Sequence, residues 1–364
     1  MVVHFVKRVK TISGGLEQGG DNFLLLRFIA AAAVIYGHAP AITGGSGPPD
    51  IFVWLNWGEY SGSIAVDLFF VISGFLITGS FLRRQHVADF VWARFIRIMP
   101  AYSVCLLLSA FLLGPLFTSN SLEEYFANPE PYAYVSKNLP LKTDMAWDLP
   151  GVFAGNPKRT TINGSIWTLP AEVRMYAWAA LLGLVGVITT RWLFNAVIVG
   201  LFIFGLLYPN DIPLVPMSEY VRLAGLFATG AFCYINRSRI PIHGGLLLAT
   251  CGIAYLCRST RIYPYLFAGC EAQFVFWFTY NISWRCFNRF GDYSYGIYLW
   301  GFPAQQMVAA IAENLPSLLN ALCGFVVALF LAAASWHAVE KPALGLKSAP
   351  SALMRWLRRE LASR

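Results

Sequence analysis

The chain has 364 residues, of which 57% are hydrophobic and only 13% are charged, and its mean hydropathy is +0.55. The apolar residues come in long runs, which excludes a soluble protein of two or three domains and predicts an all-α protein that crosses a membrane many times. The net charge of +8 does not require a nucleic-acid partner, because Lys and Arg are enriched in the inner segments of membrane proteins.

Ten apolar runs are predicted to cross the membrane as helices. No signal peptide precedes the first run, so we expect this span to act as its own anchor. The breaks within residues 191–283 are short, which leaves nine or eleven spans as alternatives. The predicted spans are about 23–43, 62–82, 99–118, 170–189, 191–208, 214–235, 242–258, 262–283, 291–312 and 316–337.

The first span contains Arg27 and His38, with ten residues between them. At about 3.6 residues per turn they share one helix face, roughly 16 Å apart along the axis. A fixed cation and a titratable imidazole are costly in hydrocarbon, so the pair indicates a functional site. The alternative is an arginine whose side chain reaches the interface and a histidine that is hydrogen-bonded there.

The second span contains Asp67 and the small pair Ser73-Gly74. Small residues allow two helices to approach closely, and a carboxylate in hydrocarbon needs a partner. We therefore expect a close helix contact here and a pairing of Asp67 with an intramembrane arginine.

A cytoplasmic stretch is predicted to follow the second span. It contains Arg94 and Arg97, which are three residues apart and hence neighbours on a helix. Paired guanidinium groups at a membrane surface suit phosphate binding. The alternative is a basic anchor that contacts lipid headgroups.

The predicted outer loop, residues 119–165, is too long for a simple connection, and such loops usually cover or build a site. It leads into a segment in which Pro170 suits the first turn of a helix. Glu172 then falls where free N–H groups favour an ionised carboxylate. This places Glu172 in the half of the membrane that contains His38, unless it only caps its helix.

The sequence lacks the motifs of several other common types of catalytic site. The seven cysteines lie in or at the ends of apolar runs without a CxxC pair, and are interpreted as buried small side chains. The five histidines have no metal-ligand spacing, so no metal site is predicted. The sequence also lacks a G-x-S-x-G elbow and a P-loop, which argues against a serine hydrolase or a P-loop NTPase.

The charge distribution predicts the orientation of the chain. With the amino terminus inside, most of the 27 Lys and Arg residues fall in inner segments, so both termini are expected in the cytoplasm. The predicted organisation is a cytoplasmic segment over residues 1–22, a transmembrane domain over 23–337 and a basic cytoplasmic tail over 338–364.

Six segments, in order, resemble the membrane-bound acyltransferase family 3, whose bacterial members O-acylate sugars. They are RFIAAAAVIYGH from Arg27, DLFFVISGFLIT from Asp67, RFIRIMPAY from Arg94, SIWTLPAEVRMY from Ser165, YSYGIYLW from Tyr293 and VEKP from Val339. The length and the lack of a C-terminal esterase-like domain look most like exopolysaccharide O-acetyltransferases of the xanthan type. Two positions depart from the family pattern: Gly301 replaces a frequent histidine, and Val173 replaces a frequent second glutamate.

The resemblance implies transfer of an acetyl group from acetyl-CoA to a sugar hydroxyl of a lipid-linked or nascent exopolysaccharide, with mannose as a candidate sugar. It implies a multi-pass protein of the bacterial inner membrane, with acetyl-CoA as co-substrate and no tightly bound cofactor. The expected partners are the saccharide acceptor, membrane lipid and other polysaccharide-assembly proteins. A transporter or flippase of a lipid-linked saccharide is the rival class, although no inverted repeat is detectable.

Roles follow for the candidate residues. His38 is the expected general base, with Glu172 or Asp67 orienting it or holding the sugar. Arg94 and Arg97 would bind the phosphates of acetyl-CoA. A covalent acyl-His intermediate is the alternative mechanism.

The remaining candidates concern the donor arm and the acceptor. Arg27 would contact the pantetheine arm or polarise the thioester carbonyl. Ser73, Trp167 and Tyr295 are assigned to the acceptor site or to structural support.

Overall fold

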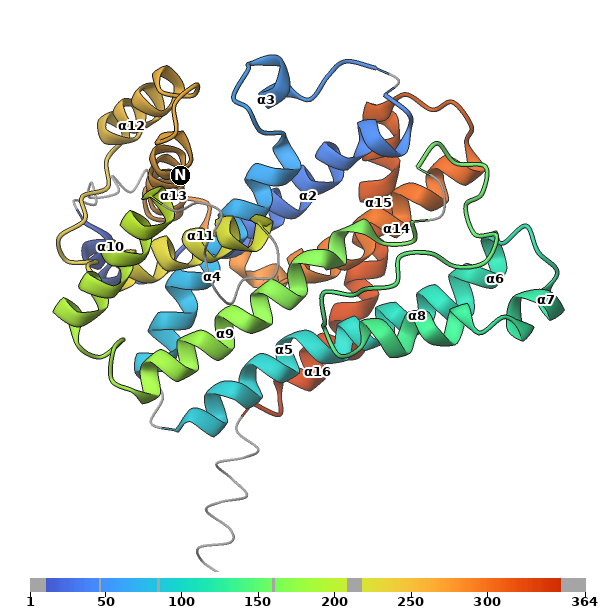
Figure 1. Cartoon of the computed structure of the whole chain (residues 1–364), viewed down its shortest axis with the longest axis horizontal. Coiled ribbons are helices and arrows are strands. Elements are labelled where there is room, and N and C mark those ends of the chain that lie inside the picture. Colours follow the sequence, from blue (N-terminus) through green and yellow to red (C-terminus); the bar gives the residue numbers. More distant parts are fainter. Residues whose placement is uncertain (1–10, 46, 84–85, 159–160, 208–217, 348–364) are drawn as a thin grey trace, which may run out of the picture. The chain divides into compact units, whose positions relative to one another are not determined.

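The computed structural model describes residues 11–45, 47–83, 86–158, 161–207 and 218–347. Within these ranges every named element is a helix, and three isolated bridge pairs are the only strand-like contacts (Figure 1). The all-helical prediction is therefore confirmed. Residues 1–10 of the predicted amino-terminal segment and residues 348–364 of the basic tail lie outside the described residues.

The chain divides into two compact units, which are discontinuous in sequence. Unit 1 contains Met1–Gly37, Pro49–Leu82 and Val185–Ser294, and unit 2 contains His38–Pro48, Arg83–Leu184 and Tyr295–Arg364. One boundary falls inside α2 (Phe23–Ile42), directly before His38.

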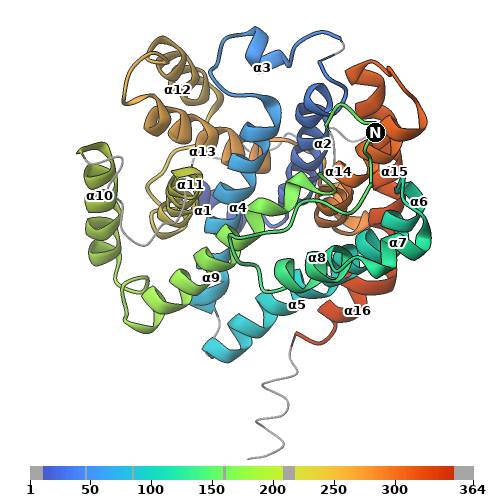
Figure 2. The same ribbon diagram turned by 45° about the vertical axis from the view of Figure 1, so that its right-hand side comes forward.

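Unit 1 is built around α4 (Ser61–Arg83), most of whose residues are buried. A hairpin of α12 and α13 lies with its two helices side by side (Figures 1 and 2). Besides α2 and α4, the helices of this unit are α1 (Ile12–Glu17), α3 (Ile51–Trp54), α10 (Arg191–Leu207), α11 (Ser218–Ile235), α12 (Gly244–Leu256), α13 (Tyr263–Asn281) and η3 (Arg285–Phe290).

Two glycines bring α4 and α11 into backbone contact. A Cβ added at Gly74 would lie 1.9 Å from the carbonyl oxygen of Phe227, and one added at Gly230 would lie 2.0 Å from that of Val71. The close helix approach predicted at the Ser73-Gly74 pair is therefore confirmed, since no larger residue fits either position.

Replacing Gly74 by alanine is expected to destabilise the protein by about 1–3 kcal/mol, because the helices must separate to admit a methyl group. Thermal unfolding of the detergent-solubilised protein measures this effect. Gly252→Ala in α12 is the matched control, since an added Cβ there meets no atom within 4 Å. Equal midpoints for the two variants would contradict the predicted contact.

Unit 2 contains an almost continuous helix formed by α5 (Val87–Leu108), the π-helix η1 (Ser109–Leu113) and α6 (Gly114–Phe117). α8 and α9 both lie beside α5 (Figures 1 and 2). The other helices of this unit are α7 (Leu122–Ala127), α8 (Glu130–Asn138), η2 (Gly164–Thr168), α9 (Leu169–Leu184), α14 (Ser294–Ile311), α15 (Ser317–Ser335), η4 (Trp336–Glu340) and α16 (Lys341–Leu344).

The predicted outer loop is folded onto this helix. The N-terminus of α7 has a capping box in which Ser121 and Glu124 bond each other's backbone. Tyr125 donates a hydrogen bond to the carbonyl of Ala110 at 2.7 Å, and burial raises the pKa of Tyr125 to about 12, so its hydroxyl stays protonated. Tyr102 donates to the carbonyl of Asn138 at 3.0 Å. The loop is therefore an ordered part of unit 2.

Within the described part of the chain, four helices are long and apolar enough to cross a membrane. They are Phe23–Ile42, Ser61–Arg83, Val87–Phe117 and Ser317–Leu344. Each of the other predicted spans also coincides with a helix over its described residues. Membrane character is thus supported, while the total of ten crossings and the cytoplasmic location of both termini stay predictions.

The third span differs from its predicted boundary. We expected it to begin near residue 99, but α5 begins at Val87 and contains both Arg94 and Arg97. The two arginines are neighbours on this helix, as predicted, and the helix continues into the predicted span. Each arginine also packs on an aromatic ring of unit 2.

We expect compartment-sensitive reporters fused after Pro140 and at the C-terminus to give opposite signals. The reason is that the charge bias places the loop outside and the tail inside. The same signal from both fusions would contradict the predicted topology.

Candidate active site

His38 lies in the last turns of α2 and packs against α14. Its ring centroid is 5.4 Å from that of Phe302, with the two rings nearly perpendicular. One turn further along α2, Ile42 forms a small core cluster with Phe302 and Ala309. The Nδ1 atom of His38 is buried and has no hydrogen-bond partner among the described residues. The imidazole is thus positioned by packing and keeps this nitrogen available.

The segment from Asn163 to Thr168 is fixed to the same part of α14. Asn163 donates a hydrogen bond to the carbonyl of Leu299 at 2.8 Å, and Tyr298 donates to the carbonyl of Ser165 at 2.5 Å. Gly164 lies against the ring of Phe302, where an added Cβ would be 2.7 Å from the ring. Phe302 therefore contacts both His38 and the start of η2.

The outer loop is also tied to α14, through Gln306. Its side-chain amide donates to the carbonyls of Lys158 and Thr161 at 2.7 and 2.8 Å, and Asn156 donates to its side-chain oxygen at 2.9 Å. Lys158 interacts electrostatically with His38. The loop thus places the charge of Lys158 within electrostatic reach of His38, while a role of the loop in covering or building a site stays a prediction.

Glu172 lies in the first turn of α9, as predicted, and accepts a hydrogen bond from the hydroxyl of Tyr176 one turn later. The ring of Tyr176 lies 6.0 Å from the guanidinium carbon of Arg94, which is also 5.9 Å from the ring of Phe90. A tyrosine therefore links the carboxylate of Glu172 to an arginine of α5.

Arg97 lies between a carboxylate and an aromatic ring. Its Nη1 atom is 3.4 Å from Oε2 of Glu340, and its guanidinium carbon is 5.4 Å from the ring centroid of Tyr295. Glu340 is only 2% exposed and accepts a second hydrogen bond from Ser335 at 3.0 Å. Tyr295 donates to the carbonyl of Ile98 at 3.0 Å.

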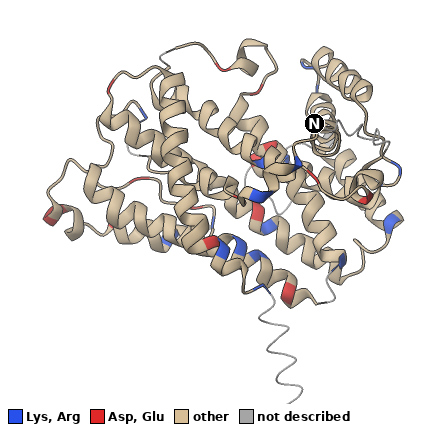
Figure 3. Cartoon of the chain, turned by 180° about the vertical axis from the view of Figure 1, so that it is seen from behind, with Lys and Arg blue, Asp and Glu red and all other residues tan. Residues whose placement is uncertain are grey.

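Of the six segments that resemble the acyltransferase family, four thus meet around Tyr295. Glu172, Glu340 and Arg97 are all electrostatic neighbours of its hydroxyl. In Figure 3 most of the ribbon is uncharged, and charged residues recur along α5. The meeting point combines two arginines with two carboxylates, so a phosphate-bearing ligand would have to exchange with these internal partners.

Unit 1 contains the other candidates. Arg27 forms an ion pair with Asp292 at 2.7 Å, and its guanidinium carbon is 5.9 Å from the ring of Phe69. Asp292 also accepts a hydrogen bond from the hydroxyl of Ser294 at 2.5 Å. Ser73 is half-buried on α4. The charge of Arg27 is therefore balanced within unit 1.

Asp67 forms an ion pair with Arg222 of α11 at 2.7 Å, so the predicted pairing with an arginine is confirmed, while the position of α11 in the membrane stays a prediction. Arg222 also donates to the hydroxyl of Ser63 at 2.8 Å and lies 4.0 Å from Glu59. The carboxyl group of Glu271 on α13 is buried and interacts electrostatically with Asp67. This cluster joins α4, α11 and α13.

Several contact residues were not assigned from the sequence. Glu271 had a usable signal, since it is a lone carboxylate within an apolar run. Glu340 lies in the segment VEKP, but no catalytic or binding role was predicted for it. Tyr176 lies in one of the quoted segments, one turn after Glu172, but was not assigned a role. Phe302 and Asp292 had no distinguishing spacing, because their contacts with His38 and Arg27 join segments far apart in the chain. Trp167 is half-buried in η2 of unit 2, and Tyr295 is buried in α14.

The comparisons agree with the resemblance seen in the motifs. The family model described as an acyltransferase domain (acyltransferase 3) matches residues 22–337, so the chain belongs to this family. An O-acetyl transferase of Shigella phage Sf6 is 30% identical over 347 residues, which cover 86% of this chain and 93% of the relative. Nodulation protein 10 of Rhizobium leguminosarum bv. viciae is 29% identical over 174 residues, covering 43% of this chain and 42% of the relative. No solved structure matches the chain.

Proposed function

We propose that this protein is an O-acetyltransferase that moves an acetyl group from acetyl-CoA to a sugar hydroxyl of a lipid-linked or nascent exopolysaccharide. The observation that carries the proposal is the arrangement in unit 2. Phe302 contacts both His38 and Gly164, the residue directly before the segment SIWTLPAEVRMY that resembles the family. The relative named O-acetyl transferase supports the same type of acyl group.

His38 acts as general base in this proposal. A sugar hydroxyl is a weak nucleophile at neutral pH, so removal of its proton as the oxygen attacks the thioester carbonyl assists the reaction. The imidazole takes the hydroxyl proton and later returns it to the departing CoA thiolate, so the proton balance closes. An acyl-His intermediate is the competing mechanism.

Arg94 and Arg97 bind the phosphates of acetyl-CoA in this proposal. Both guanidinium groups lie on α5 next to aromatic rings, which hold their planes in place. Arg97 would exchange Glu340 for a phosphate, and charge-assisted hydrogen bonds make that exchange feasible. Arg27, paired with Asp292, is the candidate for the pantetheine arm or the thioester carbonyl.

The acceptor side rests on the outer loop and η2. Trp167 supplies aromatic surface and Tyr295 a ring and a hydroxyl, both in unit 2. Ser73 on α4 of unit 1 is a separate candidate for the acceptor or for structural support. We place the protein in the bacterial inner membrane and propose a xanthan-type polysaccharide, with mannose as a candidate sugar. Other polysaccharide-assembly proteins are proposed partners. A saccharide flippase remains the rival function.

Comparison of saccharides from cells with and without the gene tests the function. Mass spectrometry is expected to show acetyl esters on one sugar only when the gene is present. Base treatment, which removes esters, should abolish the difference. Saccharides without esters in both strains, together with reduced export in the mutant, would favour the flippase.

The donor role of the arginines is tested with a double variant, because removing Arg97 alone would leave Glu340 as a buried carboxylate without its partner. Arg97→Ala with Glu340→Gln is expected to weaken acetyl-CoA binding about 10- to 100-fold, the value of one charge-assisted hydrogen bond. Glu340→Gln alone keeps the arginine and should bind normally, and Arg94→Ala is expected to resemble the double variant. Equilibrium binding of labelled acetyl-CoA gives the affinities. Unchanged affinity in the double variant would leave these arginines as topological anchors.

A further inference from the structure

Two cysteines of unit 1 face each other across the α12–α13 hairpin. The Sγ atoms of Cys251 on α12 and Cys270 on α13 are 2.7 Å apart. The interpretation of the cysteines as buried side chains applies to Cys105, Cys233 and Cys270. Cys251 and Cys257 are only partly buried, and Cys286 and Cys323 are exposed.

The hairpin holds the two sulfurs at a packed position. Cys270 belongs to a core cluster with Ile64, Ala254 and Phe267, and Cys251 packs against this cluster. In contrast, α12 buries only Leu247 and Ala254. Since few of its side chains are buried, α12 depends on its contact with α13 for its position.

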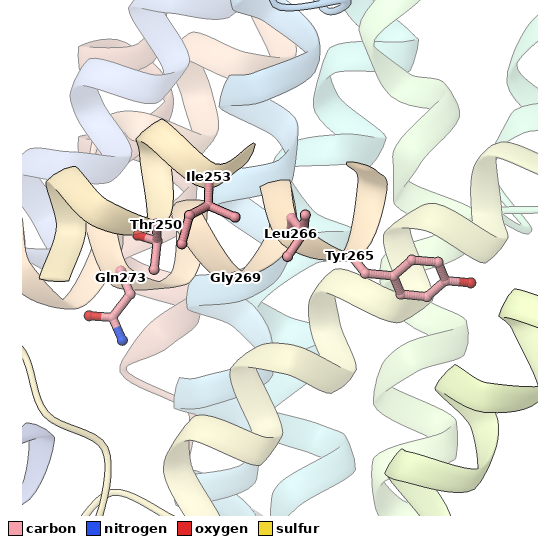
Figure 4. A pocket seen from close by; sticks show the side chains of 6 residues that line it. All are labelled: Thr250, Ile253, Tyr265, Leu266, Gly269 and Gln273. Carbon is pink, nitrogen blue, oxygen red and sulfur yellow. The ribbon is translucent and has the colours of Figure 1, made fainter. Parts of the chain in front are cut away.

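A pocket opens next to the cysteine pair. It has a volume of about 280 Å³ and is lined by side chains of α12 and α13 (Figure 4). Its lining includes Thr250 and Gly269, the chain neighbours of Cys251 and Cys270. An added Cβ at Gly269 would meet no atom within 4 Å, so the space beside the pair is open. The cysteines themselves do not line the pocket, but Cys251 is only partly buried, so a small neutral reagent can reach its sulfur.

We propose that Cys251 and Cys270 are a redox pair that forms a reversible disulfide by exchange with an external disulfide. Cys251 is the attacking thiol because it is the more exposed of the two. Its thiolate attacks one sulfur of the external disulfide, forms a mixed disulfide and releases one thiol. The thiolate of Cys270 then attacks Sγ of Cys251 and releases the second thiol.

The reaction balances without a further reagent. The two cysteine sulfurs are oxidised, the external disulfide is reduced, and the two cysteine protons end on the two released thiols. The new bond fastens α12 to α13 immediately before Glu271, which interacts with Asp67. We therefore expect oxidation to stabilise this side of unit 1 against unfolding.

The test uses the full chain in detergent and the small neutral reagent hydroxyethyl disulfide. After treatment, denaturation and alkylation, wild-type protein is expected to lose alkylation at both Cys251 and Cys270, whereas exposed cysteines such as Cys286 and Cys323 carry mercaptoethanol adducts that their mass distinguishes from a cross-link. Peptide mapping should identify a Cys251–Cys270 cross-link, and a reducing agent should restore all seven thiols.

Two variants give the order of the steps. Cys270→Ser should retain a mercaptoethanol adduct on Cys251, whereas Cys251→Ser should remain unmodified at Cys270, which is only 5% exposed. Cys233→Ser, a buried cysteine of α11, is the matched control and should still form the cross-link. A wild type without a Cys251–Cys270 cross-link after oxidation, or a cross-link that maps to other cysteines, would overturn the proposal.

Discussion

Replacing His38 by alanine is expected to lower acetyl transfer by roughly 10²–10⁴-fold, the range for losing a positioned general base. The ring packs on Phe302, and its Nδ1 atom has no hydrogen-bond partner among the described residues, so no neighbour is arranged to take over the proton. His38→Gln keeps a polar side chain that cannot accept this proton, and is expected to be nearly as poor. Turnover with labelled acetyl-CoA gives the rates.

The control for this prediction is His86→Ala. His86 is exposed at the N-cap of α5 and makes no capping hydrogen bond with its side chain, so its loss should leave the rate unchanged. Acetylation by His38→Ala at a wild-type rate, with equal amounts of folded protein, would refute the general-base mechanism. Glu172 would then be the next candidate base.

Removing Arg222 is expected to cost about 3 kcal/mol of unfolding free energy, near the lower end for breaking a buried ion pair. Asp67 is almost fully buried, while the side chain of Arg222 is 31% exposed, and this exposure lowers the expected loss. Arg222→Met leaves Asp67 and Glu271 as buried carboxyl groups without a cation between α4, α11 and α13. Thermal unfolding in detergent measures the change.

A double variant separates the ion pair from packing. Arg222→Met with Asp67→Asn removes both charges and is expected to recover part of the lost stability, because the uncompensated carboxylate is gone. Arg222→Lys should stay closer to the wild type than Arg222→Met. Equal stability of Arg222→Met and the wild type would show that the cluster does not hold these helices together.

The helices of this protein could be predicted well from hydropathy, because long apolar runs have few other solutions in a membrane. The start of α5 was not predicted, because hydropathy indicates where a membrane span begins and not where its helix begins, and Arg94 and Arg97 are good helix formers. The close approach at Gly74 was predictable from residue size alone.

Candidate residues were easier to find than their partners. Buried charges such as Arg27, Asp67 and Glu172 stand out in an apolar sequence. The partner of Arg27, Asp292, lies 265 residues further along the chain, and no local pattern indicates it. The contact of His38 with Phe302 depends in the same way on how α14 packs, which only the tertiary structure shows.

The central claim is the transfer of acetyl from acetyl-CoA to a sugar hydroxyl. Purified protein in lipid vesicles, supplied with isotopically labelled acetyl-CoA and a lipid-linked saccharide, tests it directly. We predict label in a base-labile ester on the sugar, CoA released in equal amount, and loss of both signals in His38→Ala. Movement of the saccharide across the vesicle without any label on it would contradict this account.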